Sequence, residues 1–235
     1  MTVLLILALL AGDDKAATDA LDQFKTGYKA KDAPSRAKAV EELAKTQHDK
    51  VTARLASILA TDEKEVRCAA AKGLGDRTDE KEKKKAGLAL SGAFKPNEKL
   101  PEVLVALIAA LGKLRDEAGL PEVHKQLEAD TTEVVQAAVE ACVAVKSTLS
   151  FDPLIKRLKE IDEALKPREP GAGGRGGVGG GRLGGTNSRE AREMARTLQP
   201  VFMKALAALG SINCENGKDW EDWWKEHRAT FKIQK

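Results

Sequence analysis

The stretch Asp62-Glu63-Lys64-Glu65-Val66-Arg67-Cys68-Ala69-Ala70-Ala71-Lys72-Gly73-Leu74-Gly75 decides the fold class of this chain. Its apolar residues recur at steps of three and four, as one face of an α-helix requires. A related phrase begins at Asp130, and the segment 102–112 carries the same apolar pattern between the two. Because Asp62 and Asp130 lie 68 residues apart, two units of about 34 residues fit between them. Such a period predicts an α-solenoid, in which each helix pair buries its apolar stripe against its neighbours.

The composition agrees with tightly packed helices. Aromatic residues make up only 4 % of the 235 residues, whereas alanine, leucine, lysine and glutamate are abundant, and small side chains let helix axes approach closely. We therefore predict an all-α protein, an α-solenoid of about four to five helix pairs with a glycine-rich insertion and C-terminal capping helices.

The chain divides into four predicted segments. A leader occupies residues 1–12, helical repeats occupy 18–165, a flexible glycine-rich insertion occupies 166–186, and helices that complete or cap the solenoid occupy 187–235. The helices expected in the repeats are 18–31, 35–46, 51–59, 66–74, 80–94, 101–114, 121–129, 132–146 and 153–162.

The leader is an apolar run of about ten residues followed by Asp13 and Asp14. It is too short to cross a bilayer as a helix. A signal peptide cleaved near Ala11 or Gly12 is one interpretation, although the basic residue usual before such a run is missing. The alternatives are an apolar first helix of the solenoid and a start codon placed too far downstream.

Three features define the end of the chain. Ten of the fifteen residues from Gly171 to Gly185 are glycine, a composition typical of a flexible linker. A helix is predicted over 187–212, with a kink or break near Leu198 caused by Pro200. A last helix is predicted over 219–232.

Capping boxes mark the predicted starts of three helices. Asp62 stands three residues before Glu65, Asp130 before Glu133, and Asn187 before Glu190. In such a box the first side chain accepts from orphan backbone amides while the glutamate reaches back.

The charge distribution disfavours nucleic acid as a partner. Six basic and two acidic side chains between residues 166 and 192 give this segment a charge of +4, so the rest of the chain, whose total is +3, sums to −1. A phosphate-binding solenoid needs a basic footprint that the repeats lack. The run from Lys83 to Lys85 is interpreted as a solvated outer face, because Asp79, Glu80 and Glu82 neutralise it.

No constellation supports catalysis, a cofactor or a metal. The Gly-x-Gly-x-x-Gly matches lie in the glycine tract without a preceding strand, and the three histidines are far apart and outside metal-ligand spacing. Cys68 and Cys142 are predicted to be buried as small apolar residues. Cys214 lies in a loop that fits an exposed thiol.

A stripe of aromatic side chains closes the chain. Trp220, Trp223, Trp224, His227 and Phe231 are spaced to share one helix face. They fit anchors for a partner, since tryptophan dominates binding hot spots. The alternative is that this helix folds back and caps the open end of the stack.

The phrase from Asp62 to Gly75, with Arg67 in place, resembles the HEAT repeat of the short bacterial type. Residues 48–146 match this pattern well, and 18–46 and 152–212 match it more loosely. Leu104 and Val135 stand where Arg67 stands, so the ladder of Asp and Arg side chains typical of the family is incomplete. The closing Trp-x-x-Trp-Trp is similar to the tail behind HEAT-like repeats in some exported bacterial proteins.

This resemblance implies a non-catalytic scaffold that binds another protein along the face of its second helices, 66–74 and 103–111 among them. Candidate partner-binding residues are Arg67, Trp220, Trp223 and Trp224. The alternatives are a HEAT-like enzyme acting on nucleic acid or a bound pigment, as a glycosylase or lyase, and a structural envelope protein. The protein is expected outside the cytoplasm if residues 1–12 are a signal peptide and in the cytoplasm otherwise, without a stable membrane span.

Overall fold

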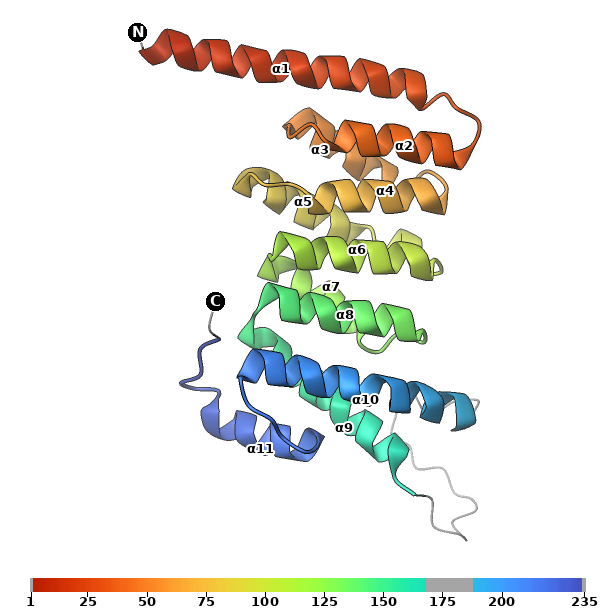
Figure 1. Cartoon of the computed structure of the whole chain (residues 1–235), viewed down its shortest axis with the longest axis vertical. Helices are drawn as coiled ribbons and strands as arrows, with labels where there is room; N and C mark the ends of the chain where they lie inside the picture. Colours follow the sequence, from red (N-terminus) through yellow and green to blue (C-terminus); the bar gives the residue numbers. More distant parts are fainter. Residues whose placement is uncertain (1, 168–187, 234–235) are drawn as a thin grey trace. The chain divides into compact units, whose positions relative to one another are not determined.

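A computed structural model describes residues 2–167 and 188–233, with side chains from Asp14 onward in the first helix. Eleven α-helices and three short 3₁₀-helices account for the regular structure of these residues, which contain no strand (Figure 1). The α-helices are α1 (Thr2–Gly27), α2 (Ala33–Ala44), α3 (Asp49–Ile58), α4 (Lys64–Gly75), α5 (Glu80–Gly92), α6 (Pro101–Leu114), α7 (Leu120–Gln126), α8 (Thr132–Val145), α9 (Phe151–Leu165), α10 (Ser188–Gly210) and α11 (Gly217–His227). The predicted all-α class is confirmed.

The chain forms two compact units, Met1–Glu122 and Val123–Lys235, with the boundary inside α7. The predicted glycine-rich insertion and the Asn187 cap lie almost entirely outside the described residues. Helix α1 continues without interruption through the region where cleavage of a leader is predicted.

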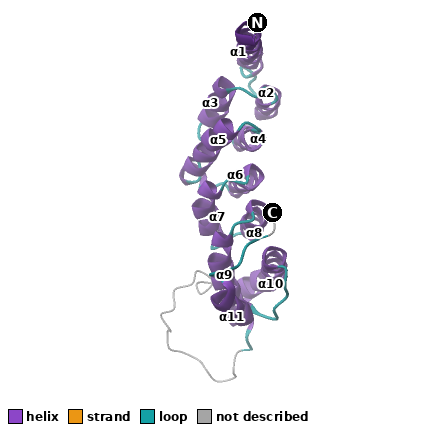
Figure 2. Ribbon diagram, turned by 90° about the vertical axis from the view of Figure 1, so that its left-hand side faces the viewer, coloured by secondary structure: helices purple, strands orange, loops and turns teal. Residues whose placement is uncertain are grey.

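In the first unit, alternate helices share a row. Helix α2 packs on α4, and α4 packs on α6, while α3 contacts both α4 and α5. Figure 2 shows α2, α4 and α6 in one row and α3 and α5 in the other. Consecutive helices therefore belong to opposite rows, and α4 is covered both by α2 and α6 of its own row and by α3 and α5 of the other.

Two glycines set the spacing in the row of α2, α4 and α6. A Cβ added to Gly73 would lie 2.6 Å from the Cβ of Ala44, and one added to Gly75 would lie 2.9 Å from the Cα of Ala110. Because the second obstacle is backbone, α4 and α6 cannot separate locally without moving a whole helix. These positions need glycine for close approach.

The core of the first unit is aliphatic. Its fully buried side chains come from both rows, so the interior lies between them. The largest are Leu43, Leu55, Ile58, Leu59, Leu74, Leu90, Leu107, Ile108 and Leu111.

The second unit packs α8 and α9 against α10, and α11 against α9. Its core includes large aromatic side chains, with Phe151, Phe202 and Trp220 fully buried. Aromatic residues are thus concentrated near the end of the chain.

Two details at this end differ from the predictions. Of the predicted kink or break near Leu198, the break does not occur, because α10 includes Pro200 in its interior. Pro200 is exposed while Leu198 is fully buried, so the proline lies away from the side of the helix that Leu198 buries. Helix α11 ends at His227, before the predicted Lys232.

The predicted capping boxes at Asp62 and Asp130 are also wrong. The N-cap residues are Glu63 for α4 and Thr131 for α8, and neither side chain caps the helix. The Asp62 carboxylate bonds to another helix pair instead, because a guanidinium lies within its reach. The effective caps lie elsewhere, such as Asp79, which accepts from the amides of Lys81 and Glu82.

Candidate partner-binding surface

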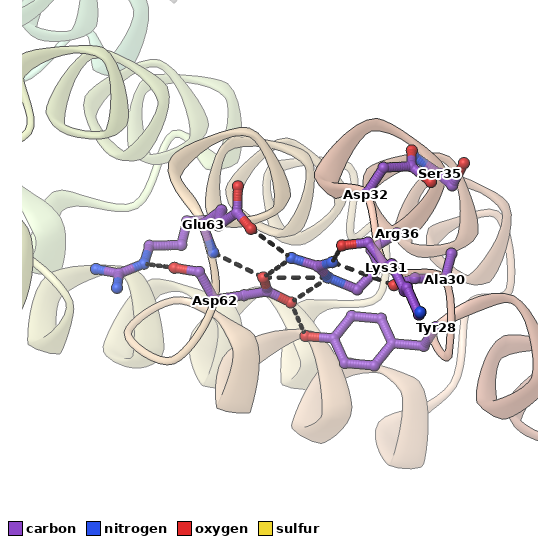
Figure 3. A network of polar contacts seen from close by, with 9 residues as sticks. Tyr28, Ala30, Lys31, Asp32, Ser35, Arg36, Asp62 and Glu63 are labelled. Atoms are coloured by element: carbon purple, nitrogen blue, oxygen red, sulfur yellow. Dashed lines mark hydrogen bonds and ion pairs between the residues drawn. The ribbon is translucent and has the colours of Figure 1, made fainter.

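A polar network joins the turn before α2 to the turn before α4 (Figure 3). The Arg36 guanidinium donates from Nη2 to Asp62 Oδ1 at 2.7 Å and to Glu63 Oε1 at 3.0 Å. Its Nη1 donates to the carbonyls of Ala30 and Lys31. The guanidinium of Arg36 therefore finds hydrogen-bond acceptors in both turns.

The network shifts the ionisation of its members. Hydrogen bonding by Arg36 is the main cause that lowers the pKa of Asp62 to about 2. Burial, followed by the hydrogen bond that Tyr28 donates to Asp62, raises the pKa of Tyr28 to about 12. The guanidinium of Arg54 lies 5.4 Å from the centre of the Tyr28 ring, a cation–π distance. These shifts stabilise a neutral tyrosine beside a charged carboxylate.

Arg67 extends this network to the next turn. Its Nε donates to the Asp62 carbonyl at 2.5 Å, and its Nη1 donates to Asn97 Oδ1 at 2.8 Å. Asn97 is fully buried and donates in turn to the carbonyls of Leu59 and Ala93. Arg67, predicted as a partner-binding candidate, therefore forms its hydrogen bonds within its own unit. Its acceptor in the next turn is the side-chain oxygen of Asn97, an asparagine and not an aspartate.

The tryptophans belong to the second unit, whereas Arg67 belongs to the first. Trp224 stacks on Phe151 with ring centres 4.3 Å apart and donates from Nε1 to Asp152 Oδ1 at 3.0 Å. Trp220 is fully buried and meets Trp223 edge-on. Trp223 is half-buried and stacks on His227. Two of the three predicted anchors thus present almost no surface, and only Trp223 remains partly accessible.

A groove opens on the row of α2, α4 and α6. It has a volume of about 380 Å³, within the usual range for ligand sites of about 300–1,000 Å³. The lining residues are Glu41, Glu65, Cys68, Ala69, Lys72, Ala106, Ala109, Ala110 and Lys113. Its lining includes four alanines, of which Ala109 is exposed and Ala106 partly exposed, together with two carboxylates and two ammonium groups.

Only some charged side chains of this groove form ion pairs among the described residues. Lys113 pairs with Asp76, but within the described part of the chain neither Glu65 nor Lys72 forms an ion pair. A second cavity of about 380 Å³ lies between α9 and α11. There Lys156 pairs with Glu128 and Lys159 with Glu221, so its charges are largely neutralised internally.

The cysteines differ in environment, and the prediction that both repeat cysteines are buried is half correct. Cys142 is fully buried, whereas Cys68 is half-exposed on the floor of the groove. Burial raises the pKa of Cys142 to about 11. Burial, then the carboxylates of Glu102 and Glu65, raises the pKa of Cys68. Both thiols are therefore held in the protonated, weakly nucleophilic form.

Sequence reasoning missed a polar group around Ser150. Its buried hydroxyl lies 3.1 Å from His124 Nε2 and also hydrogen bonds with Cys142. Burial lowers the pKa of His124. The three residues come from different helices and turns, so no spacing in the sequence connects them. With a thiol of raised pKa, this arrangement satisfies buried polar groups and does not generate a nucleophile.

The described residues include neither a membrane-spanning helix nor a metal-binding cluster. None of their helices is long and apolar enough to span a lipid bilayer, and no cluster of three or more His, Cys, Asp or Glu side chains among them could hold a metal ion.

No family model matches the chain, and comparison with curated proteins also finds no match.

Proposed function

We propose that this protein is a non-catalytic interaction scaffold, an α-solenoid of HEAT-type helix pairs that binds another protein. The groove on α2, α4 and α6 is the observation that carries this proposal. It combines an alanine floor with two charged side chains, Glu65 and Lys72, that form no ion pair among the described residues, as a surface needs if it is to bind reversibly without exposing a large apolar patch.

The helix pairing supports the architecture. Helices α3 to α6 alternate between two rows, and second helices are the elements that a HEAT-type stack offers to its ligands. The polar row from Arg36 through Asp62 and Arg67 to Asn97 connects successive turns, which is the role that a ladder of Asp and Arg side chains has in such repeats.

A matched pair of variants tests the function. Ala109 is exposed and lines the groove, whereas Ala53 is exposed on α3, in the other row. Ala109→Arg fills the groove, and Ala53→Arg adds the same side chain elsewhere. Proteins captured from native cells by the wild type and Ala53→Arg should be lost from Ala109→Arg.

Capture of the same proteins by all three forms would contradict this function. A turnover activity abolished by replacing one or two polar residues would contradict it as well, since a scaffold has no catalytic set to remove.

A further inference from the structure

The floor of the groove selects the secondary structure of its occupant. Ala69, Ala106, Ala109 and Ala110 offer methyl groups, and the backbone around them is hydrogen-bonded within α4 and α6. An extended segment placed there would leave its own N–H and C=O groups without partners, which is costly. A helix satisfies these groups internally, so a helix fits this floor better than a strand.

The charges give the groove a direction. Lys64 pairs with Glu102 near the start of α4 and α6, and Asp76 pairs with Lys113 near their ends, so the two helices run parallel. Glu65 lies in the first turn of α4, and Lys72 lies in its last turn. Seven residues of helix separate these two charges by about 10 Å.

A second ammonium group lies at the same end of the groove as Lys72. Lys113 lies in the last turn of α6. On the α2 side, Glu41 adds a carboxylate near the C-terminal end of that helix, which ends at Ala44. Toward the C-terminal ends of the three helices the groove therefore has two ammonium groups and the Glu41 carboxylate, and toward the N-terminal end of α4 its described lining has the Glu65 carboxylate alone.

We infer that the groove binds one amphipathic helix of a partner protein, antiparallel to α4 and α6. This helix carries an acidic residue in its first turns, which faces Lys72 and Lys113, and a Lys or Arg about seven residues later, which faces Glu65. Small or aliphatic residues lie between them and cover the alanines. The inference rests on the proposed function and adds the chemistry and direction of the ligand.

Helix electrostatics favour this direction over its reverse. An acid near the start and a base near the end of the occupant stabilise its own macrodipole. In an antiparallel placement the dipole of the bound helix also points opposite to those of α4 and α6, which is the favourable arrangement for neighbouring dipoles. A parallel helix would need a basic N-terminus and an acidic C-terminus to match the groove, which destabilises the helix itself.

Three synthetic peptides of equal length test the inference. The first is an alanine-based helix with Glu at one position, Leu three and four positions later, and Lys seven positions later. The second exchanges the Glu and the Lys, and the third replaces a central alanine by proline to prevent a continuous helix. Binding is measured by fluorescence anisotropy at low salt.

A second readout reports where the peptide binds. In a Cys214→Ser background, Cys68 is the one remaining accessible thiol of the described residues, so its rate of modification should fall when a peptide covers the groove. The full-length protein is used for both measurements.

We expect the first peptide to bind about three- to tenfold more tightly than the second, as a few exposed ion pairs allow, and to protect Cys68. The proline peptide should lose binding. In the double variant Glu65→Lys/Lys72→Glu, which keeps the net charge, the preference between the first two peptides should reverse. Added salt should weaken the preference.

Equal affinity for the first two peptides, undiminished binding of the proline peptide, or no binding of any peptide would each overturn the inference. The capture experiment with Ala109→Arg is independent of these results. Partners lost from that variant, combined with peptides that show no directional preference, would leave the scaffold function standing and remove the antiparallel helix.

Discussion

Arg36 and Asp62, which lie 26 residues apart, form a two-point ion pair in which Nη2 lies 2.7 Å from Oδ1 and Nε lies 3.2 Å from Oδ2. The paired geometry and the low exposure of both side chains, 13 % and 10 %, distinguish this contact from the surface ion pairs of the protein. It fixes the turn before α2 against the turn before α4.

Asp62 should make the stability of the protein sensitive to acid. Its pKa of about 2 in the folded state lies below the ordinary value of 3.8, so the charged form is favoured by folding. This stabilisation is present above about pH 4 and is lost as the pH falls toward 2. In thermal unfolding, the difference in Tm between wild type and Asp62→Asn should be largest at neutral pH and shrink in acid. A difference that is constant with pH would show that the ion pair is not its cause.

Tyr28 gives a spectroscopic test of the same network, because it is the chain's one tyrosine. Its pKa is raised from 10.0 to about 12, so its contribution to stability is present below about pH 10 and is lost as the pH rises through 12. The near-ultraviolet absorbance of tyrosinate should therefore appear with a midpoint near 12. Asp62→Asn should lower this midpoint while leaving it above 10, since burial remains the larger cause. A titration midpoint of 10 for Tyr28 in the folded wild type would contradict a hydroxyl that is partly buried and hydrogen-bonded to Asp62.

Two glycine-to-alanine substitutions should change stability in opposite directions. At Gly75 the new methyl group would meet the backbone of Ala110, whereas at Gly92 nothing lies within 4 Å. Gly75→Ala should destabilise the protein by about 1–3 kcal/mol through overpacking, and Gly92→Ala should stabilise it by about 0.4–1 kcal/mol. Urea denaturation measures both. Equal effects would mean that α4 and α6 are not in close contact.

Arg77 should be required for stability although it lies outside the groove. Its buried guanidinium donates to the carbonyls of Ala44, Thr46 and Gly73 at the ends of α2 and α4. Each buried carbonyl left without a donor costs about 1–3 kcal/mol, so Arg77→Met should lower the free energy of unfolding by at least that amount. Arg77→Lys should recover part of the loss through a single ammonium group. Urea denaturation of both variants beside the wild type tests this order, and a fully stable Arg77→Met protein would refute it.

The aromatic cluster should depend more on Trp224 than on Trp223. Trp224 is 6 % exposed, stacked on Phe151 and bonded to Asp152, so Trp224→Ala should cost about 3–5 kcal/mol. Trp223→Ala should cost clearly less, because that side chain is only half-buried. Guanidinium denaturation followed by circular dichroism compares the two. The reverse order would indicate that the half-exposed ring carries the packing.

The sequence predicted elements whose signals are local. Helix α6 begins at Pro101 and ends at Leu114 as expected, because a proline in the first turn and a continuous apolar pattern mark it. Asp62 was misassigned because its true partner, Arg36, lies in another helix pair. Of the kink or break expected near Leu198, the break does not occur, because Pro200 is exposed and the spacing of residues does not report exposure.

The candidate site was predictable only in outline. The resemblance led us to expect binding along the face of the second helices; the groove lies on α4 and α6, and binding of a partner there stays a prediction. The individual candidate residues are less accessible than expected. Arg67 forms hydrogen bonds between two turns of its own unit, and helix spacing alone could not show that Trp220 and Trp224 are buried. Burial depends on contacts between distant segments, and these are absent from any local pattern.

The bond between Trp224 and Asp152 has a consequence for the order in which the chain folds. It closes a loop of 72 residues, whereas the bonds Arg36–Asp62 and Arg67–Asn97 close loops of 26 and 30. Ordering a longer loop costs more chain entropy, and contacts between distant residues form more slowly. During synthesis the early turns can therefore close while α11 is still on the ribosome, and α11 docks onto α9 afterwards.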